Sequence, residues 1–191
     1  LQINGIRMEK NEIQKKMWSI AGTEGLKLGL VSAAYTLLTL LMAKVTIPAF
    51  INSVVTFLLW VAKFYICIWM MKNAMTKYVA DVPEVSNRDT LVLGTCTALL
   101  SAFIFASLSF INIEFIFADF YTQQIDTVMQ QMAPMMDSNT LNAVDSFMEN
   151  LPQLTFFSNL IYCFLFGTVL SAILSRNIPS KDPFADYKPQ A

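Results

Sequence analysis

The chain has 191 residues, a formal net charge of −1 and a hydrophobic share of 55%. Its mean hydropathy of +0.50 is too high for an ordinary soluble domain of this length. The near-zero net charge gives no reason to expect a nucleic-acid partner. The chain has no histidine, which excludes a Ser-His-Asp triad, a Cys-His pair and histidine metal sites within it. We expect a protein that is not an enzyme, with no catalytic residues, metal site or cofactor.

Four apolar runs are long enough to cross a bilayer core of roughly 30 Å at about 1.5 Å per residue, the first two with help from flanking residues. These runs are Leu28–Val45, Val54–Met71, Leu91–Ile111 and Leu154–Leu174. All three cysteines, Cys67, Cys96 and Cys163, fall inside them, so no disulfide framework is expected. The pattern predicts an all-α fold, a multi-pass membrane protein with a bundle of four transmembrane helices.

The chain divides into three parts. Residues 1–27 form a segment expected to be amphipathic, because apolar residues recur at helical spacing among lysines. Residues 28–174 hold the four spans and include a long outer loop, residues 112–153. Residues 175–191 contain three prolines and are expected to be an extended tail.

Local signals mark the ends of the spans. Residues 46–48 end in a proline and break the chain between the first two runs. Ser86 and Asp89 have the spacing of a capping box just before the third run. Pro152 is expected in the first turn of the fourth helix.

The outer loop is too long for a simple connection and is expected to contain two amphipathic helices. Apolar residues recur at helical spacing over residues 117–132 and again over residues 141–148. The pair Asp137-Ser138 between them is typical of a helix start. We expect both helices to lie on the top of the bundle or on the membrane surface.

A methionine string in this loop consists of Met129, Met132, Met135 and Met136. Soft thioethers can bind Cu(I), but methionine more often fills an adaptable apolar face. Because no cysteine or histidine supports a metal site here, we expect the packing role.

Basic residues are distributed unevenly over the connections. Residues 1–27, the link between the second and third runs, and the tail hold 11 of the 13 lysines and arginines. The outer loop has no lysine or arginine, and it has six acidic residues. The positive-inside rule therefore predicts cytoplasmic termini, a cytoplasmic middle link and an outer loop on the opposite side of the membrane.

Three of the spans carry small residues at four-residue spacing. The series are Gly25, Gly29 and Ala33 in the first span, Gly94, Ala98, Ala102 and Ala106 in the third, and Gly167, Ser171 and Ser175 in the fourth. Small residues let helix backbones approach closely in a membrane. We expect these faces to pack the spans against one another, with contact to a second copy or a partner as the alternative. The second span lacks such a series and is expected at the edge of the bundle.

Lys63 lies near the middle of the second span, where a lysine costs roughly 2.5–3.5 kcal/mol on insertion scales. No acid lies at its depth, since Glu24 and Glu114 belong near opposite membrane faces. The available groups within the chain are hydroxyls and carbonyls, such as those of Tyr35, Thr36, Ser101 and Tyr162. One interpretation is snorkelling or such a structural bond. The other is that Lys63 binds an acid on a partner helix or a lipid phosphate.

The tail carries a short motif, Lys181-Asp182-Pro183-Phe184, in which an aromatic residue follows a proline. Extended motifs of this kind can dock a partner protein. A disordered chain end that merely leaves the membrane is the other interpretation.

The chain resembles a known family in several features. They are the opening Gly-Leu-Lys-Leu-Gly-Leu of the first span, the loop lengths, the acidic outer helices rich in methionine and glutamine, and the ending Ile-Leu-Ser-Arg-Asn-Ile-Pro-Ser-Lys-Asp-Pro-Phe. From Met8 onward the chain is similar to the four-span membrane family of Bacteroidetes called domain of unknown function 4199. The resemblance implies a bacterial inner-membrane protein with a periplasmic outer loop and no assigned activity. It defines no catalytic residues, and members of the family are often encoded near family-2 glycosyltransferases that use lipid-linked sugars.

Two classes of function remain. The first is a non-catalytic accessory or scaffold subunit of the inner membrane, with a glycosyltransferase that uses lipid-linked sugars as the suggested partner. The second is a small transporter or lipid-binding protein, which would need a polar path that only Lys63 and scattered hydroxyls can line. Expected partners are membrane lipids and either a membrane protein or a second copy of the chain.

Overall fold

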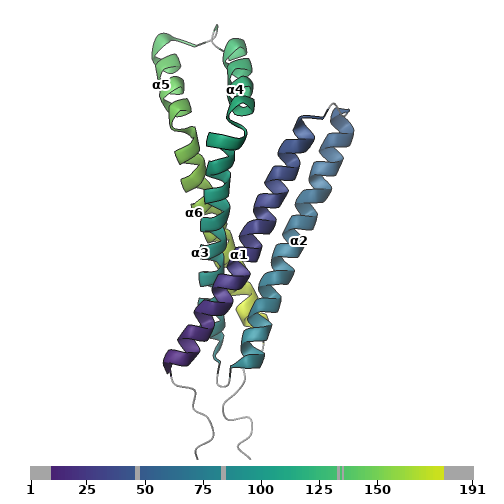
Figure 1. Cartoon of the computed structure of the whole chain (residues 1–191), viewed down its shortest axis with the longest axis vertical. Coiled ribbons are helices and arrows are strands. Elements are labelled where there is room, and N and C mark those ends of the chain that lie inside the picture. Colours follow the sequence, from purple (N-terminus) through teal and green to yellow (C-terminus); the bar gives the residue numbers. More distant parts are fainter. Residues whose placement is uncertain (1–9, 46–47, 83–84, 133, 135, 179–191) are drawn as a thin grey trace, which may run out of the picture.

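The described part of the chain folds into helices and their connections. The computed structural model describes residues 10–45, 48–82, 85–132, 134 and 136–178. In chain order the elements are α1 (Lys10–Ala43), α2 (Ala49–Asp81), α3 (Asn87–Ile111), the π-helix η1 (Asn112–Ile116), α4 (Ala118–Met132), α5 (Ser138–Glu149) and α6 (Leu151–Asn177) (Figure 1). No strand occurs within these described ranges.

Four helices are long and apolar enough to cross a membrane: α1, α2, α3 continued by η1, and α6. Helices α1 and α2 have 34 and 33 residues. At about 1.5 Å per residue each is about 50 Å long, so it tilts or extends beyond a bilayer core of roughly 30 Å. The amphipathic segment predicted over residues 1–27 is, from Lys10 onward, continuous with the first span. The prediction of an all-α, four-span membrane bundle with amphipathic helices in the outer loop is confirmed.

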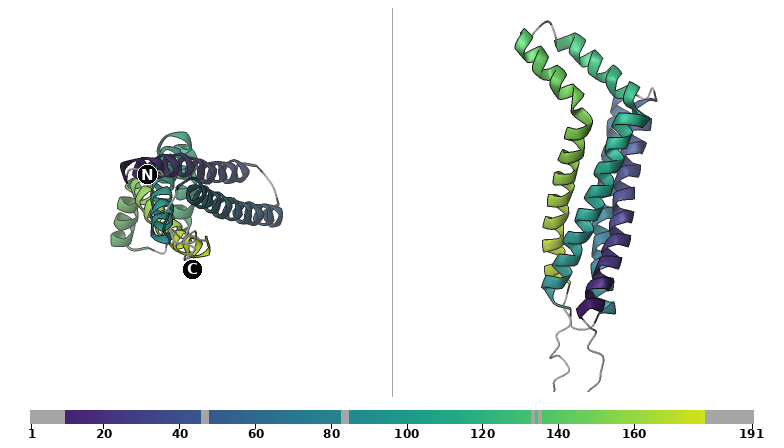
Figure 2. Two further views of the ribbon diagram at one scale, coloured as in Figure 1. Left: turned by 90° about the horizontal axis from the view of Figure 1, so that it is seen from below. Right: turned by 60° about the vertical axis from the view of Figure 1, so that its left-hand side comes forward.

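Helix α3 forms the centre of the bundle. It packs along α1 and along α6, whereas α2 packs mainly on α1 and makes few contacts with α3 and α6. The start of α1 and the end of α6 lie at the same end of the bundle, which we call the terminal end, and α4 and α5 lie at the opposite, hairpin end (Figure 1). Toward the hairpin end the α1–α2 pair diverges from the α3–α6 pair, as the left view of Figure 2 also shows.

The best-packed part of the core lies at the terminal end. Its largest fully buried side chains include Tyr78, Met75, Leu93, Val82 and Val85. Residues 72–88 read as a polar link in the sequence, but α2 continues to Asp81 and its last turns are packed. The reason is that apolar residues recur at helical spacing from Met71 to Val79, so one face is buried while Lys72 and Lys77 stay exposed on the other.

Glycines bring α1 close to α3. A Cβ added at Gly25 would lie 2.9 Å from the Cβ of Leu100, and one added at Gly29 would lie 2.8 Å from the Cβ of Ile104. These distances are shorter than real carbon–carbon contacts, so no side chain fits between the two backbones. Ala33, the third member of this series, is half-buried.

The contact between α3 and α6 is closer still. A Cβ at Gly94 would lie 2.5 Å from Oγ of Ser171, and one at Gly167 would lie 2.5 Å from the Cβ of Ala98. Ala102 and Ser171 are fully buried. Small residues of α3 thus face α6, whereas at the other contact the glycines belong to α1 and lie against Leu100 and Ile104 of α3. Both contacts show the backbone approach that membrane helices use in place of a hydrophobic driving force.

Three predicted boundary signals are confirmed. The Asp89 N–H donates to Oγ of Ser86 (3.3 Å), while the Ser86 N–H donates to Oδ2 of Asp89 (3.1 Å), which completes the capping box of α3. The N–H of Thr140 donates to Oδ1 of Asp137 (2.9 Å) at the start of α5. Pro152 lies in the first turn of α6.

One of the two expected placements put helices α4 and α5 on the top of the bundle. They do not lie there. They extend beyond its hairpin end as a bent continuation of α3 and α6 (right view of Figure 2). Between α3 and α4 the chain makes a π-turn, in which the N–H of Phe117 donates to the carbonyl of Asn112 (2.8 Å). Across the divergence, Nζ of Lys44 lies 4.7 Å from the ring centre of Phe117 and 5.7 Å from that of Phe120.

Gly167→Ala is expected to destabilise the bundle by about 1–3 kcal/mol, because the added methyl group overlaps Ala98 unless α3 and α6 move apart. Gly22→Ala is the matched control, since nothing lies within 4 Å of the Cβ that it adds. Alanine is favoured over glycine inside a helix by up to about 1 kcal/mol, so the control is neutral or stabilising. Reversible unfolding in mixed detergent micelles measures both changes. Equal effects of the two variants would contradict the close α3–α6 contact.

Candidate functional site

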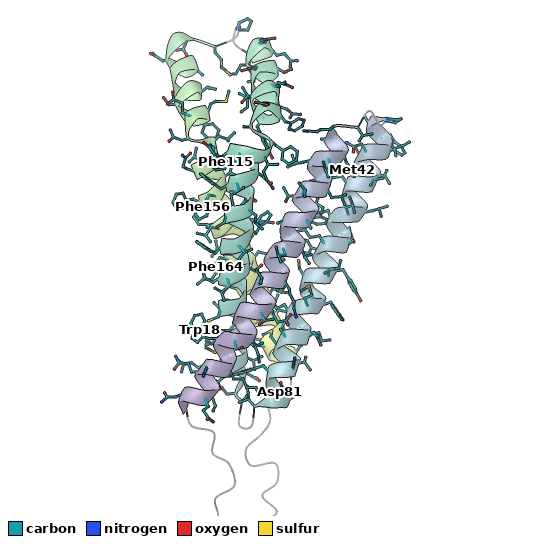
Figure 3. All side chains as sticks on the ribbon, viewed as in Figure 1. Trp18, Met42, Asp81, Phe115, Phe156 and Phe164 are labelled. Atoms are coloured by element: carbon teal, nitrogen blue, oxygen red, sulfur yellow. The ribbon has the colours of Figure 1, made fainter. Side chains whose placement is uncertain are left out.

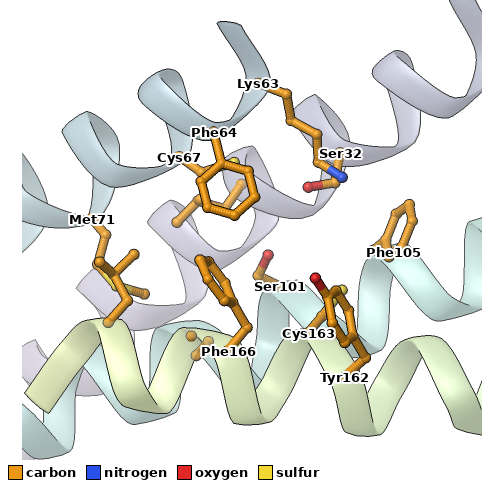
Figure 4. Close-up of a pocket in the computed structure, with 14 residues that line it drawn as sticks. Ser32, Lys63, Phe64, Cys67, Met71, Ser101, Phe105, Tyr162, Cys163 and Phe166 are labelled. Carbon is orange, nitrogen blue, oxygen red and sulfur yellow. The ribbon is translucent and has the colours of Figure 1, made fainter. Parts of the chain in front are cut away.

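A cavity of about 90 Å³ lies where the four spans meet near mid-bundle. Every span contributes to its lining, as Figure 4 shows for Ser32 of α1, Lys63 and Cys67 of α2, Ser101 of α3 and Tyr162 of α6. The walls are mainly apolar and aromatic, and the one charged side chain among the lining residues is that of Lys63. The cavity therefore combines a single cation with a largely apolar enclosure.

Two aromatic rings contact the ammonium group of Lys63. Its Nζ lies 4.9 Å from the ring centre of Tyr35 on α1 and 5.2 Å from that of Phe105 on α3. Both distances are within the range of cation–π contacts, which contribute about 0.5–2 kcal/mol each depending on desolvation. Within the described residues, Lys63 has no hydrogen bond and no ion pair. Its positive charge is therefore stabilised but not neutralised.

The hydroxyl groups named as possible partners of Lys63 take other roles. Tyr35 offers its ring face, and Oγ1 of Thr36 donates to the carbonyl of Ser32 (3.2 Å). Ser101 and Tyr162 line the same cavity without a hydrogen bond to the ammonium. The ring of Phe105 was not foreseen. A signal was available, because Phe105 lies four residues beyond Ser101 and so on the same face of α3.

The cavity is closed between α2 and α6 by aromatic side chains. The rings of Phe64 and Phe166 meet edge to face with centres 4.9 Å apart, and Trp60 lies 4.8 Å from Phe64. Because α6 runs toward the terminal end, Phe166 lies on the terminal side of Tyr162, and the cavity continues past it to Met71 and Leu170. On the hairpin side the two helix pairs diverge, and Tyr162 is 65% exposed. The ammonium thus lies near the point where this seam opens.

Two of the three cysteines line the cavity. Cys67 of α2 and Cys163 of α6 contribute to its wall, whereas Cys96 of α3 does not. All three are free thiols and half-buried. The described residues contain no group of three His, Cys, Asp or Glu side chains placed to hold a metal ion.

The outside of the spans is apolar and exposed. Less than half of each candidate span is buried inside the protein, and α2 is buried least, at 11%. Side chains project all along the spans in Figure 3, which labels Phe115 near the junction with α4. Such a surface suits contact with lipid or with another membrane protein.

The hairpin of α4 and α5 carries uncovered apolar side chains among acids. None of the residues of α4 is buried, and Val128, Met132 and Phe147 are 51%, 46% and 56% exposed. Hydrogen bonds from the side chain and backbone of Thr140 hold the pKa of Asp137 below its usual value, so this carboxylate is charged at neutral pH. Of the methionine string, Met135 lies outside the described residues.

A hollow of about 230 Å³ lies at the base of the hairpin. Glu114 of η1 and Glu149 of α5 line it together with Tyr121, whose pKa is raised by burial. The two carboxylates add to the negative charge of this end of the protein. The tail motif Lys181, Asp182, Pro183 and Phe184 lies outside the described residues.

Lys63→Met is expected to stabilise the isolated protein by about 1–2 kcal/mol. Removing a mid-membrane charge that costs roughly 2.5–3.5 kcal/mol outweighs the loss of its cation–π contacts. Lys72→Met is the control on the same helix, since Lys72 is exposed and its replacement should change stability by less than about 0.5 kcal/mol. Unfolding of the purified protein in lipid–detergent mixtures measures both. A destabilised Lys63→Met would show that the aromatic contacts of Lys63 are themselves structural.

Comparison with known proteins places the chain in a family. The family model described as "Protein of unknown function (DUF4199)" matches residues 23–176, which include most of α1 and all of α2 through α5. Neither a curated protein nor a solved structure matches the chain. The match covers more than half of the sequence and agrees with the four-span architecture described above. The chain therefore belongs to the family of domain of unknown function 4199.

Proposed function

We propose that this protein is a non-catalytic accessory or scaffold subunit that assembles with another protein at the membrane. The observation that carries the proposal is the α4–α5 hairpin, which extends beyond the bundle with apolar side chains exposed among acids. An amphipathic helix is stable when its apolar face is covered. Val128, Met132 and Phe147 are covered by neither the bundle nor the neighbouring helix, so a partner protein is the natural cover.

The negative charge of the hairpin favours a partner with a basic surface. Residues 112–153 carry six acids and no base. An anionic membrane surface and the hairpin of a second copy would both repel this charge, whereas a basic protein surface complements it. We propose a partner that presents apolar and basic side chains outside the membrane. A membrane glycosyltransferase that uses lipid-linked sugars is the class suggested by the family resemblance.

The proposed location is the bacterial inner membrane, with both termini in the cytoplasm and residues 112–153 in the periplasm. The uneven distribution of lysine and arginine supports this orientation. Both described chain ends lie at the same end of the bundle, as four spans require.

The alternative is a small transporter or a lipid-binding protein. The central cavity has a volume of about 90 Å³. Ordinary small-molecule sites occupy roughly 300–1,000 Å³. A cavity of this size suits a single side chain better than a lipid, so the geometry favours the accessory subunit.

The combined variant Val128→Ser, Met132→Ser and Phe147→Ser is expected to release the partner, because it removes apolar contact area from the hairpin. Native electrophoresis of mildly solubilised host membranes should show the wild-type chain in a larger complex and the variant at least about five-fold depleted from it. The control variant Gln123→Ser, Gln130→Ser and Ser146→Ala changes exposed polar positions of the same helices and should stay in the complex. If wild type and both variants migrate alike, the hairpin is not the assembly surface.

The orientation is tested with single cysteines in a background without the three native ones. A cysteine at Asn139 in α5 should react with a membrane-impermeant maleimide in intact spheroplasts, and one at Asn87 in α3 should react only after lysis. Both positions are exposed in the structure, so burial does not mask either result. Labelling of Asn87→Cys without lysis would reverse the orientation.

A further inference from the structure

The strongest unexplained feature of the membrane part is the charge of Lys63. We propose that the central cavity receives one carboxylate from a membrane helix of a different protein, which pairs with Lys63 at the α2–α6 seam. This inference rests on the proposed function and names the chemistry by which the partner is recognised inside the membrane.

An anion is required because the charge is not neutralised within the described protein. Lys63 lies near the middle of α2, far from either end of the helix. The rings of Tyr35 and Phe105 face the ammonium with their negative faces, but a ring carries no net charge. In a low dielectric, a carboxylate at contact distance stabilises an ammonium far more than it does in water. The two rings also fix the ammonium in position for such a pair.

A protein side chain fits the site better than a lipid headgroup. A cavity of about 90 Å³ takes a carboxylate and its short stem, but not a phosphate with its glycerol and acyl chains. Lipid phosphates also lie at the membrane surface, roughly half of the 30 Å core away from a mid-membrane lysine. An acid carried on a membrane-spanning helix is already held at this depth.

The partner is a different chain. Helix α6 contains no acid, and the acids of α1, α2 and α3 are Glu12, Glu24, Asp81 and Asp89. All four lie toward the terminal end, and Glu24 is already paired with Lys27 at 2.7 Å. Glu114 lies at the hairpin end, in η1. Among the described residues, a second copy of the chain therefore offers no carboxylate at the depth of Lys63.

The seam between α2 and α6 offers the way in. These two helices make few contacts, and the pair Phe64–Phe166 spans the seam on the terminal side of Tyr162. Toward the hairpin end α2 and α6 move apart, and Tyr162 at the rim is largely exposed. A partner helix lying along the exposed face of α2 can present its acid to Lys63 there.

The test uses the full-length protein in phosphatidylcholine vesicles and a synthetic leucine-rich transmembrane peptide with one central glutamate. The peptide carries a cysteine one turn from the glutamate, and a peptide with glutamine in place of glutamate is the matched control. Oxidation with copper phenanthroline reports which native cysteine the peptide approaches. Cys67 and Cys163 line the cavity, and Cys96 serves as the internal control.

The glutamate peptide should form disulfides with Cys67 or Cys163 at least about ten-fold more than the glutamine peptide, with no such preference at Cys96. Lys63→Met should abolish the preference and Lys63→Arg should keep most of it, while circular dichroism shows that both variants remain helical. Equal crosslinking of the two peptides, or a preference that survives Lys63→Met, overturns the inference. Loss of the preference when 30% phosphatidylglycerol is added also overturns it, since an anionic lipid is then the ligand. The crosslinking experiment does not use the hairpin variants. A failure of the proposed function would appear with those variants, and a failure of this inference would appear in the crosslinking.

Discussion

Close contact between helix backbones along α3 is the constraint on which the rest of the structure depends. In a membrane the lipid is as apolar as the helices, so helix association relies on packing and not on burial from water. Gly25 and Gly29 let α1 approach α3, and Gly94 and Gly167 do the same for α6. Helix α3 thereby becomes the fixed centre, and the positions of the other spans follow from how closely they can approach it.

Helix α2 lacks such residues, and its looser position accounts for the candidate site. Its bulky side chains keep it away from α3 and α6 except at the terminal end, where Met75 and Tyr78 are fully buried. Nearer the hairpin end the aromatic side chains of α2 cannot fill the space between the diverging helices. The cavity and the ammonium group of Lys63 lie between the well-packed terminal end of the bundle and the part where the helices diverge. The same feature that weakens the bundle there makes a surface available for another helix.

Much of this architecture is predictable from the sequence, because hydropathy and capping signals act locally. The four spans, the capping box at Ser86 and the helix start at Asp137 all follow from runs and spacings of a few residues. Tertiary detail is harder to predict. A hydropathy run gives the depth of Lys63 but not the direction in which its side chain points, so the contact with Phe105 was missed. The extension of α2 to Asp81 was missed because lysines on one helical face hide an apolar stripe on the other.

The π-turn at Asn112–Ile116 has a consequence for how such a protein can change over time. A π-turn accommodates one residue more than an α-helical turn, and one residue corresponds to a rotation of about 100° around a helix axis. Removing or adding one residue there would rotate α4 about the axis of α3, while α5 stays joined to α6 through Asn150. A change of sequence at the π-turn can therefore alter the direction of α4 while the contacts of α3 with α1 and α6 are kept.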